Sequence, residues 1–322
     1  MQKINNRKIL FISPKFFDHD VAIKNELLSK GAYVYSYSDI SNSIFTRVIS
    51  KLKLLKIYVK LFETYLVFKF GKRHIDYVFV IKGQNLDQFF FQNLKLKLQA
   101  EKFILYQWDS VQNFDYTSLL PVFDVVYSFD PKDCKHHNLK YLPLYFGNEY
   151  MNIRSLDSYF YDVSYIGQYL TERHNFITQF KEEYEKIGGK VFIHEYISMK
   201  NIIKEVLVNR RIPKGIQLKK LNRNQVIEIY SKSKSIIDMP SPQQSGYTMR
   251  TFETLGSHRK LITTNVLVDC LSISNQNLFI VKDRIITKKI ILDIIEFNKN
   301  QFLPQSHIEY YSISNWLNNV FA

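Results

Sequence analysis

The chain has 322 residues, a length that favours two domains over a single core, and its 46% hydrophobic content with 25 Phe and 22 Tyr excludes a disordered protein. The two cysteines, Cys134 and Cys270, stand far apart and in no CxxC spacing, which argues against a disulfide framework and a structural zinc site and favours a reducing compartment. The formal net charge of +14 points to an anionic partner, but no RNA-recognition, zinc-finger or helix-turn-helix motif indicates nucleic acid.

Strand and helix patterns alternate through the first half of the chain. Short apolar runs, each followed by a helical or polar stretch, predict strands at 8–13, 33–37, 77–81, 103–108 and 125–129. Such alternation is typical of βαβ units and a mostly parallel sheet. Residues 143–161 lose this periodicity, and we expect them to connect two domains.

The second half alternates in the same way without repeating the first half in sequence. Strands are predicted at 163–167, 191–196, 235–239, 260–265 and 278–282. We therefore expect the α/β fold class, with two tandem Rossmann-like, doubly wound domains that face a cleft. Because open parallel sheets bind ligands beyond the carboxyl ends of their strands, functional residues should follow the strands directly.

Polar residues do follow the predicted strands. In the second half, Gly167 and Arg173 come just after a strand. In the first half, the residues after strands are Asp18, His19, Asp20, Lys82, Gly83, Trp108 and Asp109.

The segment 241–265, SPQQSGYTMRTFETLGSHRKLITTN, predicts a loop, a short helix and a strand. Ser245 and Gly246 give a loop whose backbone N–H groups can point outward at the helix start, where free donors and the helix dipole attract phosphate. Arg250 and Glu253 are three residues apart and share a helix face. An arginine can hold an anion and a carboxylate can accept two hydroxyl protons, a pairing that suits a nucleoside diphosphate and its ribose. The structural alternative is a surface ion pair between the two side chains.

Basic residues concentrate in segment 47–73, where eight Lys or Arg stand beside one acidic residue, Glu63. The apolar residues that recur there at helical spacing are Val48, Leu52, Leu55, Val59, Phe62 and Leu66. This pattern fits a domain helix with a core-facing stripe, and it equally fits a helix on an anionic membrane surface or beside an anionic acceptor. No signal peptide and no apolar run of membrane-spanning length is present, so we expect a cytoplasmic protein, held peripherally at the inner face of the cytoplasmic membrane.

Several segments stand in one order: VFVIKGQNL (78–86), ILYQWDSVQN (104–113), 125–146, 161–177, QSGYTMRTFETLGSHRKLITTN (244–265) and YSISNWLNNVF (311–321). In sequence and in order they resemble GT-B glycosyltransferases, particularly those of bacterial capsule and lipopolysaccharide clusters and their spore-coat, CgeB-like relatives. The resemblance covers most of the chain and is weakest at 40–75 and 200–225.

The resemblance implies transfer of a sugar from a nucleotide-sugar donor to a saccharide or lipid-linked saccharide acceptor in capsule or lipopolysaccharide biosynthesis. It implies an acceptor-binding domain at 1–150, a nucleotide-sugar-binding domain at 151–305 and a C-terminal helix, 306–322, that packs back toward the first domain. Lys82, Gly83 and Trp108 would line the acceptor side. The expected donor site consists of Gly167, Arg173, Gln244, Ser245, Gly246, Thr248, Arg250, Glu253, Thr264 and Asn265.

An inverting enzyme of this kind needs a base in the first domain, whereas a retaining enzyme does not need one in the same position. The sequence leaves this choice open. Asp109 and Asp18 are the first candidates for the base, followed by His19. Each aspartate can equally serve as the N-cap of a helix, as can Asp20.

We expect neither a metal nor another cofactor, because arginines and a helix N-terminus can stabilise a leaving phosphate. Asp18-His19-Asp20 does match the DxD metal motif of the GT-A fold, but that motif lies mid-chain in GT-A enzymes and follows the first strand here. His136 and His137 have no carboxylate or cysteine at a spacing that would complete a metal site.

Two other classes of function remain open at this stage. A non-catalytic sugar-binding or nucleotide-binding protein would keep the diphosphate pocket without a base. A nucleotide-sugar epimerase of related fold would need neither an acceptor site nor a membrane surface.

Overall fold

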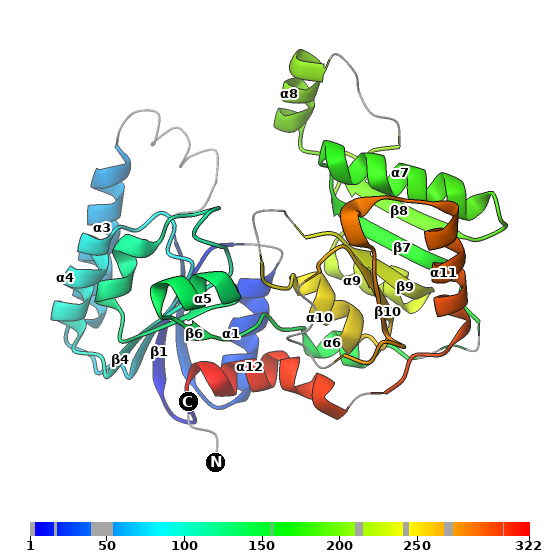
Figure 1. Ribbon diagram of the computed structural model, residues 1–322. Helices are drawn as coiled ribbons and strands as arrows, with labels where there is room; N and C mark the ends of the chain where they lie inside the picture. The colour runs from blue at the N-terminus through cyan, green and yellow to red at the C-terminus, as the bar shows by residue number, and fades with distance from the viewer. Residues whose placement is uncertain are drawn as a thin grey trace. The chain divides into compact units, whose positions relative to one another are not determined.

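The computed structural model describes residues 4–15, 18–39, 54–154, 156, 158–209, 215–240, 245–266, 273–304 and 306–322. The chain divides into two compact units (Figure 1). The first unit consists of Met1–Leu144, Pro242–Tyr247 and Ile313–Ala322, and the second of Tyr145–Ser241 and Thr248–Ser312. Each unit contains a parallel sheet with alternating helices, which confirms the α/β class with two Rossmann-like domains.

The sheet of the first unit is parallel throughout its described strands. Their order is β2 (Tyr33–Ser38), β1 (Lys8–Ser13), β3 (Tyr77–Ile81), β4 (Lys102–Gln107), β5 (Val125–Ser128) and β6 (Lys140–Tyr141). The helices of this unit are α1 (His19–Ser29), α3 (Leu55–Phe70), α4 (Gln88–Leu98), α5 (Pro131–His137) and α12 (Ile313–Val320), with a 3-10 turn at Thr117–Val122.

Alternating side chains of the first sheet fill two different cores. Val78 and Val80 of β3 pack in one core with Leu66 of α3 and Phe90 of α4. Phe79, between the two valines, points to the opposite face. In Figure 1, α3 and α4 lie together on one side of this sheet, and α1 and α12 lie on the other.

The C-terminal helix α12 supplies part of the second of these cores. Trp316 is buried, and its ring centroid lies 4.8 Å from that of Tyr106 and 6.1 Å from that of Phe79. Lys30, after α1, donates hydrogen bonds to Ser314 at 2.7 Å and to Asn318 at 3.0 Å. The last helix of the chain therefore completes the core of the first unit.

The sheet of the second unit is also parallel in its described strands. Their order is β11 (Leu278–Ile280), β10 (Lys260–Thr263), β9 (Ser233–Asp238), β7 (Tyr161–Gln168) and β8 (Val191–Tyr196). The helices are α6 (Asn148–Met151), α7 (Thr171–Glu185), α8 (Met199–Asn209), α9 (Arg223–Ser231), α10 (Met249–Gly256) and α11 (Lys288–Lys299). Two 3-10 turns, Lys282–Arg284 and Ser306–Tyr311, complete the unit.

Helices cover both faces of this second sheet. On one face, Val163 and Ile237 of the sheet pack with Phe180 of α7 and Ile294 of α11. On the other face α10 is buried, and the ring of its Phe252 lies 4.9 Å from the ring of Tyr311.

The strand order of each sheet places its first strand in the interior. In the second unit β8 lies on one side of β7, and β9 lies on the other. This reversal of direction is a topological switch point, and ligands of open α/β sheets bind beyond the carboxyl ends of the strands at such a point. The segments after β7 and β9, which lead to α7 and α10, are therefore the first place to look for a site.

Candidate functional site

Helix α10 is anchored to the carboxyl end of β9 through one buried carboxylate. Asp238 Oδ2 accepts hydrogen bonds from the hydroxyl groups of Thr248 and Thr251, each at 2.7 Å. Thr248 is also the N-cap, since its side chain accepts a hydrogen bond from the Thr251 N–H at 3.3 Å. Thr248, predicted to contact the nucleotide, thus holds the helix in place.

The guanidinium of Arg250 lies over this end of the sheet. Its Cζ is 6.0 Å from the ring centroid of Tyr165 in β7. Its Nε is buried and has no hydrogen-bond partner among the described residues. Burial alone would lower the pKa of Arg250, but the nearby Tyr230 and Asp238 outweigh burial and raise it. Arg250 is therefore a permanent cation with a donor to spare.

A second arginine, Arg173 of α7, acts electrostatically on the same tyrosine. Arg173 also has a buried Nε without a partner in the described part of the chain, and so does the Tyr165 hydroxyl. Burial raises the pKa of Tyr165, while Arg250 and Arg173 act to lower it. Two cations and one hydroxyl therefore meet at the carboxyl end of β7, an arrangement suited to an anion.

Gly167 has a structural reason to be glycine. A Cβ atom at this position would lie 2.4 Å from the Tyr165 hydroxyl. The absence of a side chain at Gly167 therefore leaves room for the side chain of Tyr165. The predicted contact of Gly167 with the donor phosphates stays a prediction.

Glu253 is partly exposed on α10 and lies beside Tyr150 of α6. Burial raises the pKa of Glu253, whereas Arg250 and a hydrogen bond from Tyr150 lower it. Arg250 and Glu253 form no ion pair within the described structure, so the surface ion pair considered as an alternative is wrong. An ion pair does join Arg223 and Glu149 close by, at 2.9 Å.

The loop before α10 differs from the expectation. Ser245 donates its backbone N–H to Asp130 Oδ2 at 2.8 Å, and its hydroxyl to Asp130 Oδ1. A Cβ atom on Gly246 would lie 2.5 Å from the carbonyl oxygen of Phe129. The outward-pointing N–H predicted for Ser245 is therefore wrong, since Asp130 accepts both this N–H and the Ser245 hydroxyl. The outward-pointing N–H of Gly246 stays a prediction. Gln244 lies outside the described residues.

Thr264 and Asn265 both follow β10 and are buried. The Thr264 hydroxyl has no hydrogen-bond partner among the described residues. The Asn265 N–H donates to the Thr263 hydroxyl at 3.1 Å. Both predicted residues thus lie at the expected edge of the second sheet, and Thr264 keeps a polar atom for a ligand.

One buried pair was missed by the sequence analysis. Glu195 in β8 accepts a hydrogen bond from His174 Nδ1 in α7 at 2.6 Å. The Glu195 side chain is only 3% exposed, and its Oε1 has no partner in the described chain. The signal in the sequence is a charged residue inside the apolar strand VFIHEY (191–196).

The first unit brings Lys82 and Asp109 together at its own carboxyl edge. Lys82 follows β3, Asp109 follows β4, and Lys82 Nζ lies 2.5 Å from Asp109 Oδ2. Both Lys82 and Gly83 have positive φ, of 65° and 67°, which turns the chain sharply after β3. Asp109 begins no described helix, so its interpretation as an N-cap is wrong.

Trp108 and His19 belong to the same region. Their ring centroids are 6.3 Å apart, and His19 is buried while Trp108 is partly exposed. Asp18 is the N-cap residue of α1, but its side chain makes no capping hydrogen bond and is exposed, and its φ of 59° is left-handed. Asp20 lies in the first turn of α1.

Asp39, directly after β2, is a second buried carboxyl that the sequence analysis missed. Burial raises the pKa of Asp39 to about 7, although Lys82 and a hydrogen bond from the Gln84 N–H act to lower it. Its Oδ2 has no hydrogen-bond partner among the described residues. No apolar pattern in the sequence marks Asp39 as a buried residue, since it follows a half-exposed strand.

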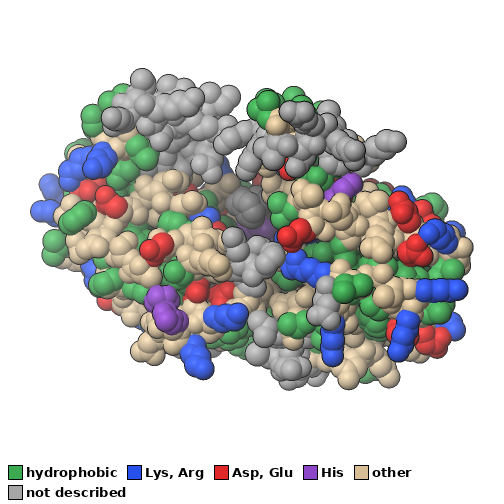
Figure 2. Space-filling view, turned by 45° about the horizontal axis from the view of Figure 1, so that its top comes forward, with side chains coloured by type: hydrophobic (Ala, Val, Ile, Leu, Met, Phe, Trp, Pro, Cys, Tyr) green, Lys and Arg blue, Asp and Glu red, His purple; other side chains and the backbone are tan. Residues whose placement is uncertain are grey.

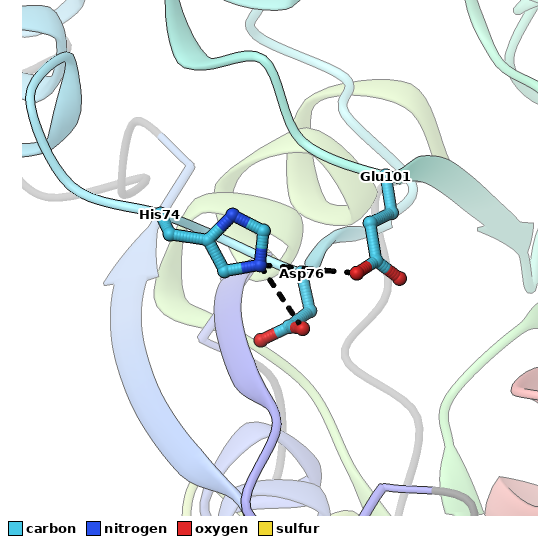
Figure 3. Close-up of side chains that lie close together, drawn as sticks. All are labelled: His74, Asp76 and Glu101. Atoms are coloured by element: carbon cyan, nitrogen blue, oxygen red, sulfur yellow. Dashed lines mark hydrogen bonds and ion pairs between the residues drawn. The ribbon is translucent and has the colours of Figure 1, made fainter.

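A further cluster lies at the opposite, amino edge of the first sheet (Figure 3). His74 Nε2 points toward Asp76 at 3.3 Å and toward Glu101 at 3.8 Å, and the three ligand atoms lie within 4.8 Å of one another. Arg7 already binds both carboxylates, at 2.5 Å and 2.9 Å. These ion pairs therefore link the amino ends of neighbouring strands. Because Arg7 already compensates the negative charge of the two carboxylates, little of that charge remains to bind a metal ion.

Helix α3 has apolar residues on two faces. Leu66 and Phe70 are buried, and Val59 and Phe62 pack against the same core, so the stripe predicted from the sequence faces inward. A second set is exposed: Ile57 by 58%, Leu61 by 65% and Phe68 by 88%. In Figure 2, hydrophobic and Lys or Arg side chains lie side by side at the left end, where α3 and α4 lie in Figure 1. Residues 47–53 of the basic segment lie outside the described residues.

Among the described helices, none combines the length and the apolar character that crossing a bilayer requires.

Comparison with solved structures identifies the fold. The chain is similar to AviGT4, a glycosyltransferase involved in avilamycin A biosynthesis, with a TM-score of 0.60 and 8% identity over 98% of this chain and 97% of that one. It is similar to Anabaena Alr3699/HepE, solved with UDP and glucose, with a TM-score of 0.57 and 10% identity over 98% of this chain and 99% of that one. The chain is also similar to a structure assigned to a UDP-N-acetylglucosamine 2-epimerase of Listeria monocytogenes. The TM-score is 0.52 and the identity 10%, over 97% of this chain and 94% of that one.

These similarities show a GT-B fold over 98% of the chain. No protein-family model and no curated protein matches the sequence. Because a glycosyltransferase and an epimerase both share the fold, the activity has to be argued from the site itself.

Proposed function

We propose that the protein is a metal-independent glycosyltransferase that moves a sugar from a nucleotide-sugar donor to a saccharide or lipid-linked saccharide acceptor. One observation carries this proposal: Arg173, Arg250 and Tyr165 bring buried polar atoms, without partners in the described chain, to the carboxyl end of β7. A buried polar group without a partner costs about 1–3 kcal/mol. A ligand that pairs with these donors regains that energy, and two arginines select an anion.

A nucleoside diphosphate fits this arrangement. The arginines bind its phosphates, and Glu253, three residues from Arg250 on α10, accepts the hydroxyl groups of the ribose. When the bond between sugar and phosphate breaks, negative charge develops on the leaving phosphate. Cations already fixed in place stabilise that charge without having to reorganise. This is why we propose a reaction that needs no metal.

The acceptor belongs to the first unit in this proposal. Asp109, held by Lys82, is the proposed base if the reaction inverts the anomeric centre. Asp109→Asn should then abolish transfer while donor binding stays normal. Near-normal turnover of this variant would direct the search to Asp18 or His19, or to a retaining mechanism.

We also propose that α3 holds the enzyme on an anionic membrane, where lipid-linked precursors of capsule or lipopolysaccharide are found. The support is the exposed apolar set Ile57, Leu61 and Phe68, with Lys56 and Lys60 on the same helix. Apolar side chains that enter the headgroup region and lysines that meet anionic lipids act together in such helices. The formal net charge of +14 favours the same partner.

The decisive experiment incubates the purified protein with a panel of nucleotide sugars, with and without short saccharide acceptors. A glycosyltransferase releases free nucleotide and forms a glycosylated product, in excess chelator as well as without it. An epimerase converts the sugar and keeps it on the nucleotide. Binding without any turnover would leave only a binding protein, and turnover that stops with chelator and returns with manganese would overturn the metal-independent mechanism.

A further inference from the structure

Two aspartates at the start of α5 make contacts outside their own helix. Asp130 is the N-cap residue and is 2% exposed, and Asp133 lies in the first turn. The Asp130 side chain caps α5 in the usual way, by accepting a hydrogen bond from the Lys132 N–H at 2.9 Å. Each of the two carboxyl groups also accepts hydrogen bonds from a loop that leads to a residue of the proposed mechanism.

Asp133 holds the loop that carries Asp109. Its Oδ2 accepts a hydrogen bond from the Val111 N–H at 2.8 Å and another from the Tyr116 hydroxyl at 3.1 Å. Val111 follows Asp109 by only two residues. Asp109 is thus restrained in two ways, because Lys82 binds its carboxylate at 2.5 Å and Asp133 fixes the backbone just beyond it.

Asp130 holds the loop that leads into α10. Its Oδ2 accepts the Ser245 N–H at 2.8 Å, and its Oδ1 accepts the Ser245 hydroxyl. Shortly after Ser245, Thr248 is the N-cap of α10, and Arg250 lies in the first turn of that helix. The chain passes from the first unit to the second between Tyr247 and Thr248. Helix α10 therefore starts from a chain segment that is fixed within the first unit.

We propose that Asp133 and Asp130 are positioning residues for the sugar transfer: Asp133 positions the base, Asp109, and Asp130 positions the start of α10 and with it Arg250. This inference rests on the proposed function and adds to it two residues that act only through these loops. A misplacement of about 1 Å can cost a factor of about one hundred in rate. A loop that becomes ordered only when the ligand binds lowers the apparent affinity, because fewer molecules are ready to bind.

The chemistry of asparagine separates the two contacts of Asp130. An asparagine has one carbonyl oxygen, which can keep the cap of α5, and its amide group is a donor that then faces the Ser245 N–H. D130N should therefore remove the loop contact while the helix keeps its cap. D87N is the matched control, because Asp87 caps α4 through the Phe90 N–H at 2.9 Å.

Asp133 is tested by removing and then restoring its acceptor oxygen. D133A removes the hydrogen bonds to both Val111 and Tyr116. D133N can place its carbonyl oxygen where Oδ2 lies and should restore the function lost in D133A. Y116F is the control, because it removes the hydroxyl bond to Asp133 and leaves the bond from the Val111 N–H in place.

Amide hydrogen exchange gives a first readout that needs no substrate. The Val111 amide should exchange faster in D133A than in the unmodified protein, and the Ser245 amide should exchange faster in D130N, because each has lost its acceptor. D87N and Y116F should leave both amides protected. Unchanged exchange of these amides in D133A and D130N would overturn the inference.

Binding and turnover give the second readout. Binding of UDP, GDP, CDP and ADP is compared by calorimetric titration, and D130N should weaken the tightest of them by about fivefold to tenfold, while D133A leaves it unchanged. With the donor and acceptor found by the nucleotide-sugar panel, D133A should lower kcat by roughly tenfold to hundredfold at an unchanged KM for the donor. D133N should recover most of this loss.

D109N and R250A are the references, because they remove the groups that are positioned. If both behave as the unmodified protein, the proposed function fails together with this inference, and normal turnover of D109N alone removes the role of Asp133. If both are impaired while D133A turns over normally and D130N binds normally, the site stands and the positioning roles are overturned. Equal losses in D133A and Y116F, or in D130N and D87N, would also overturn them.

Discussion

Arg250 combines permanent charge with an unused donor, and this combination sets the properties of the site. Its neighbours Tyr230 and Asp238 raise the pKa of Arg250 against the effect of burial, so its charge does not depend on pH. Asp238 itself is satisfied by two threonine hydroxyls. The spare Nε of Arg250 therefore remains for a ligand instead of being neutralised within the protein.

The first prediction concerns Arg250 and Glu253. Arg250→Ala and Glu253→Ala should each weaken binding of the nucleoside diphosphate by roughly 1–3 kcal/mol, because each removes a charged hydrogen bond. The two should differ in one respect: Arg250→Ala should matter little for a free nucleoside, whereas Glu253→Ala should also weaken nucleoside binding. Calorimetric titration measures both, and wild-type affinity in both variants would remove this site from consideration.

The second prediction concerns Asp39 and the dependence of stability on pH. Burial raises the pKa of Asp39 to about 7, so between the unfolded pKa and 7 the folded protein holds a proton that the unfolded chain has lost. Its contribution to stability is therefore complete below the unfolded pKa and is lost as pH rises toward 7. Asp39→Asn should unfold at a higher temperature than wild type at pH 8, and the difference should vanish toward pH 4.

Asp76 serves as an internal control, because its contribution to stability should change with pH in the opposite direction to that of Asp39. The backbone N–H of Lys8 and the Arg7 guanidinium lower the pKa of Asp76 although its burial acts to raise it. Its stabilising contribution is present above the unfolded pKa and is lost as pH falls through the folded value. Asp76→Asn should therefore destabilise the protein at pH 8, with the gap closing on acidification. Identical pH profiles for the Asp39 and Asp76 variants would contradict the assignment of both groups.

At the scale of the element, helix α3 has one apolar face more than a domain helix requires. Its inner face supplies Leu66 and Phe70 to the core. Its outer face exposes Ile57, Leu61 and Phe68 to solvent. An apolar surface of this kind on a basic helix is typical of a segment that meets a membrane or a partner.

The third prediction tests this outer face of α3. Replacing Ile57, Leu61 and Phe68 together by Gln should strongly reduce co-sedimentation with vesicles containing anionic lipid, since each buried apolar side chain contributes about 1.5–3 kcal/mol. Replacing Lys56 and Lys60 by Gln should also weaken binding, by about 1 kcal/mol each, and this effect should fade in high salt.

Leu207→Gln, which changes a residue 75% exposed on α8, is the matched control and should bind vesicles normally. Activity on a short soluble acceptor should be nearly unchanged in all of these variants. If the unmodified protein ignores anionic vesicles at low salt, the membrane role of α3 is excluded.

At the scale of the whole molecule, the chain crosses between the units more than once. The first unit is completed by the segment 242–247 and by the last ten residues, Ile313–Ala322. Trp316 and Leu317 are buried there against strands formed far earlier in the sequence. Neither unit therefore corresponds to one continuous piece of chain.

The fourth prediction follows from this connectivity. Trp316→Ala should lower the stability of the first unit by roughly 3–5 kcal/mol, the usual cost of truncating a large buried aromatic residue. Tyr310→Ala, which changes an aromatic residue 49% exposed nearby in sequence, should have a much smaller effect. The free energy of unfolding in urea measures the loss of stability in both variants, and limited proteolysis reports whether the first unit is the part that opens. A protein truncated after Ser312 whose first unit resists protease as well as the full chain would contradict the prediction.

Much of this fold could be read from local sequence. The strands at 8–13, 77–81 and 191–196 lie where their apolar runs predicted them, because buried parallel strands read as continuous apolar segments. The sequence also placed Arg173 and Arg250 after strands, and therefore at the edge where ligands bind. Hydrophobic periodicity and chain order determine these features, since both depend on neighbours along the chain.

Tertiary structure alone decided which polar groups remain available. Ser245 lost its predicted role because Asp130, more than a hundred residues earlier, accepts both of its donors. His174 of α7 is held in place because the buried Glu195 of β8, twenty-one residues later, accepts a hydrogen bond from it. The burial that raises the pKa of Asp39, and the exposure of one face of α3, likewise depend on which segments pack together. Local sequence determines where strands and helices form, but pairing and burial of their polar atoms arise from contacts that only the folded chain creates.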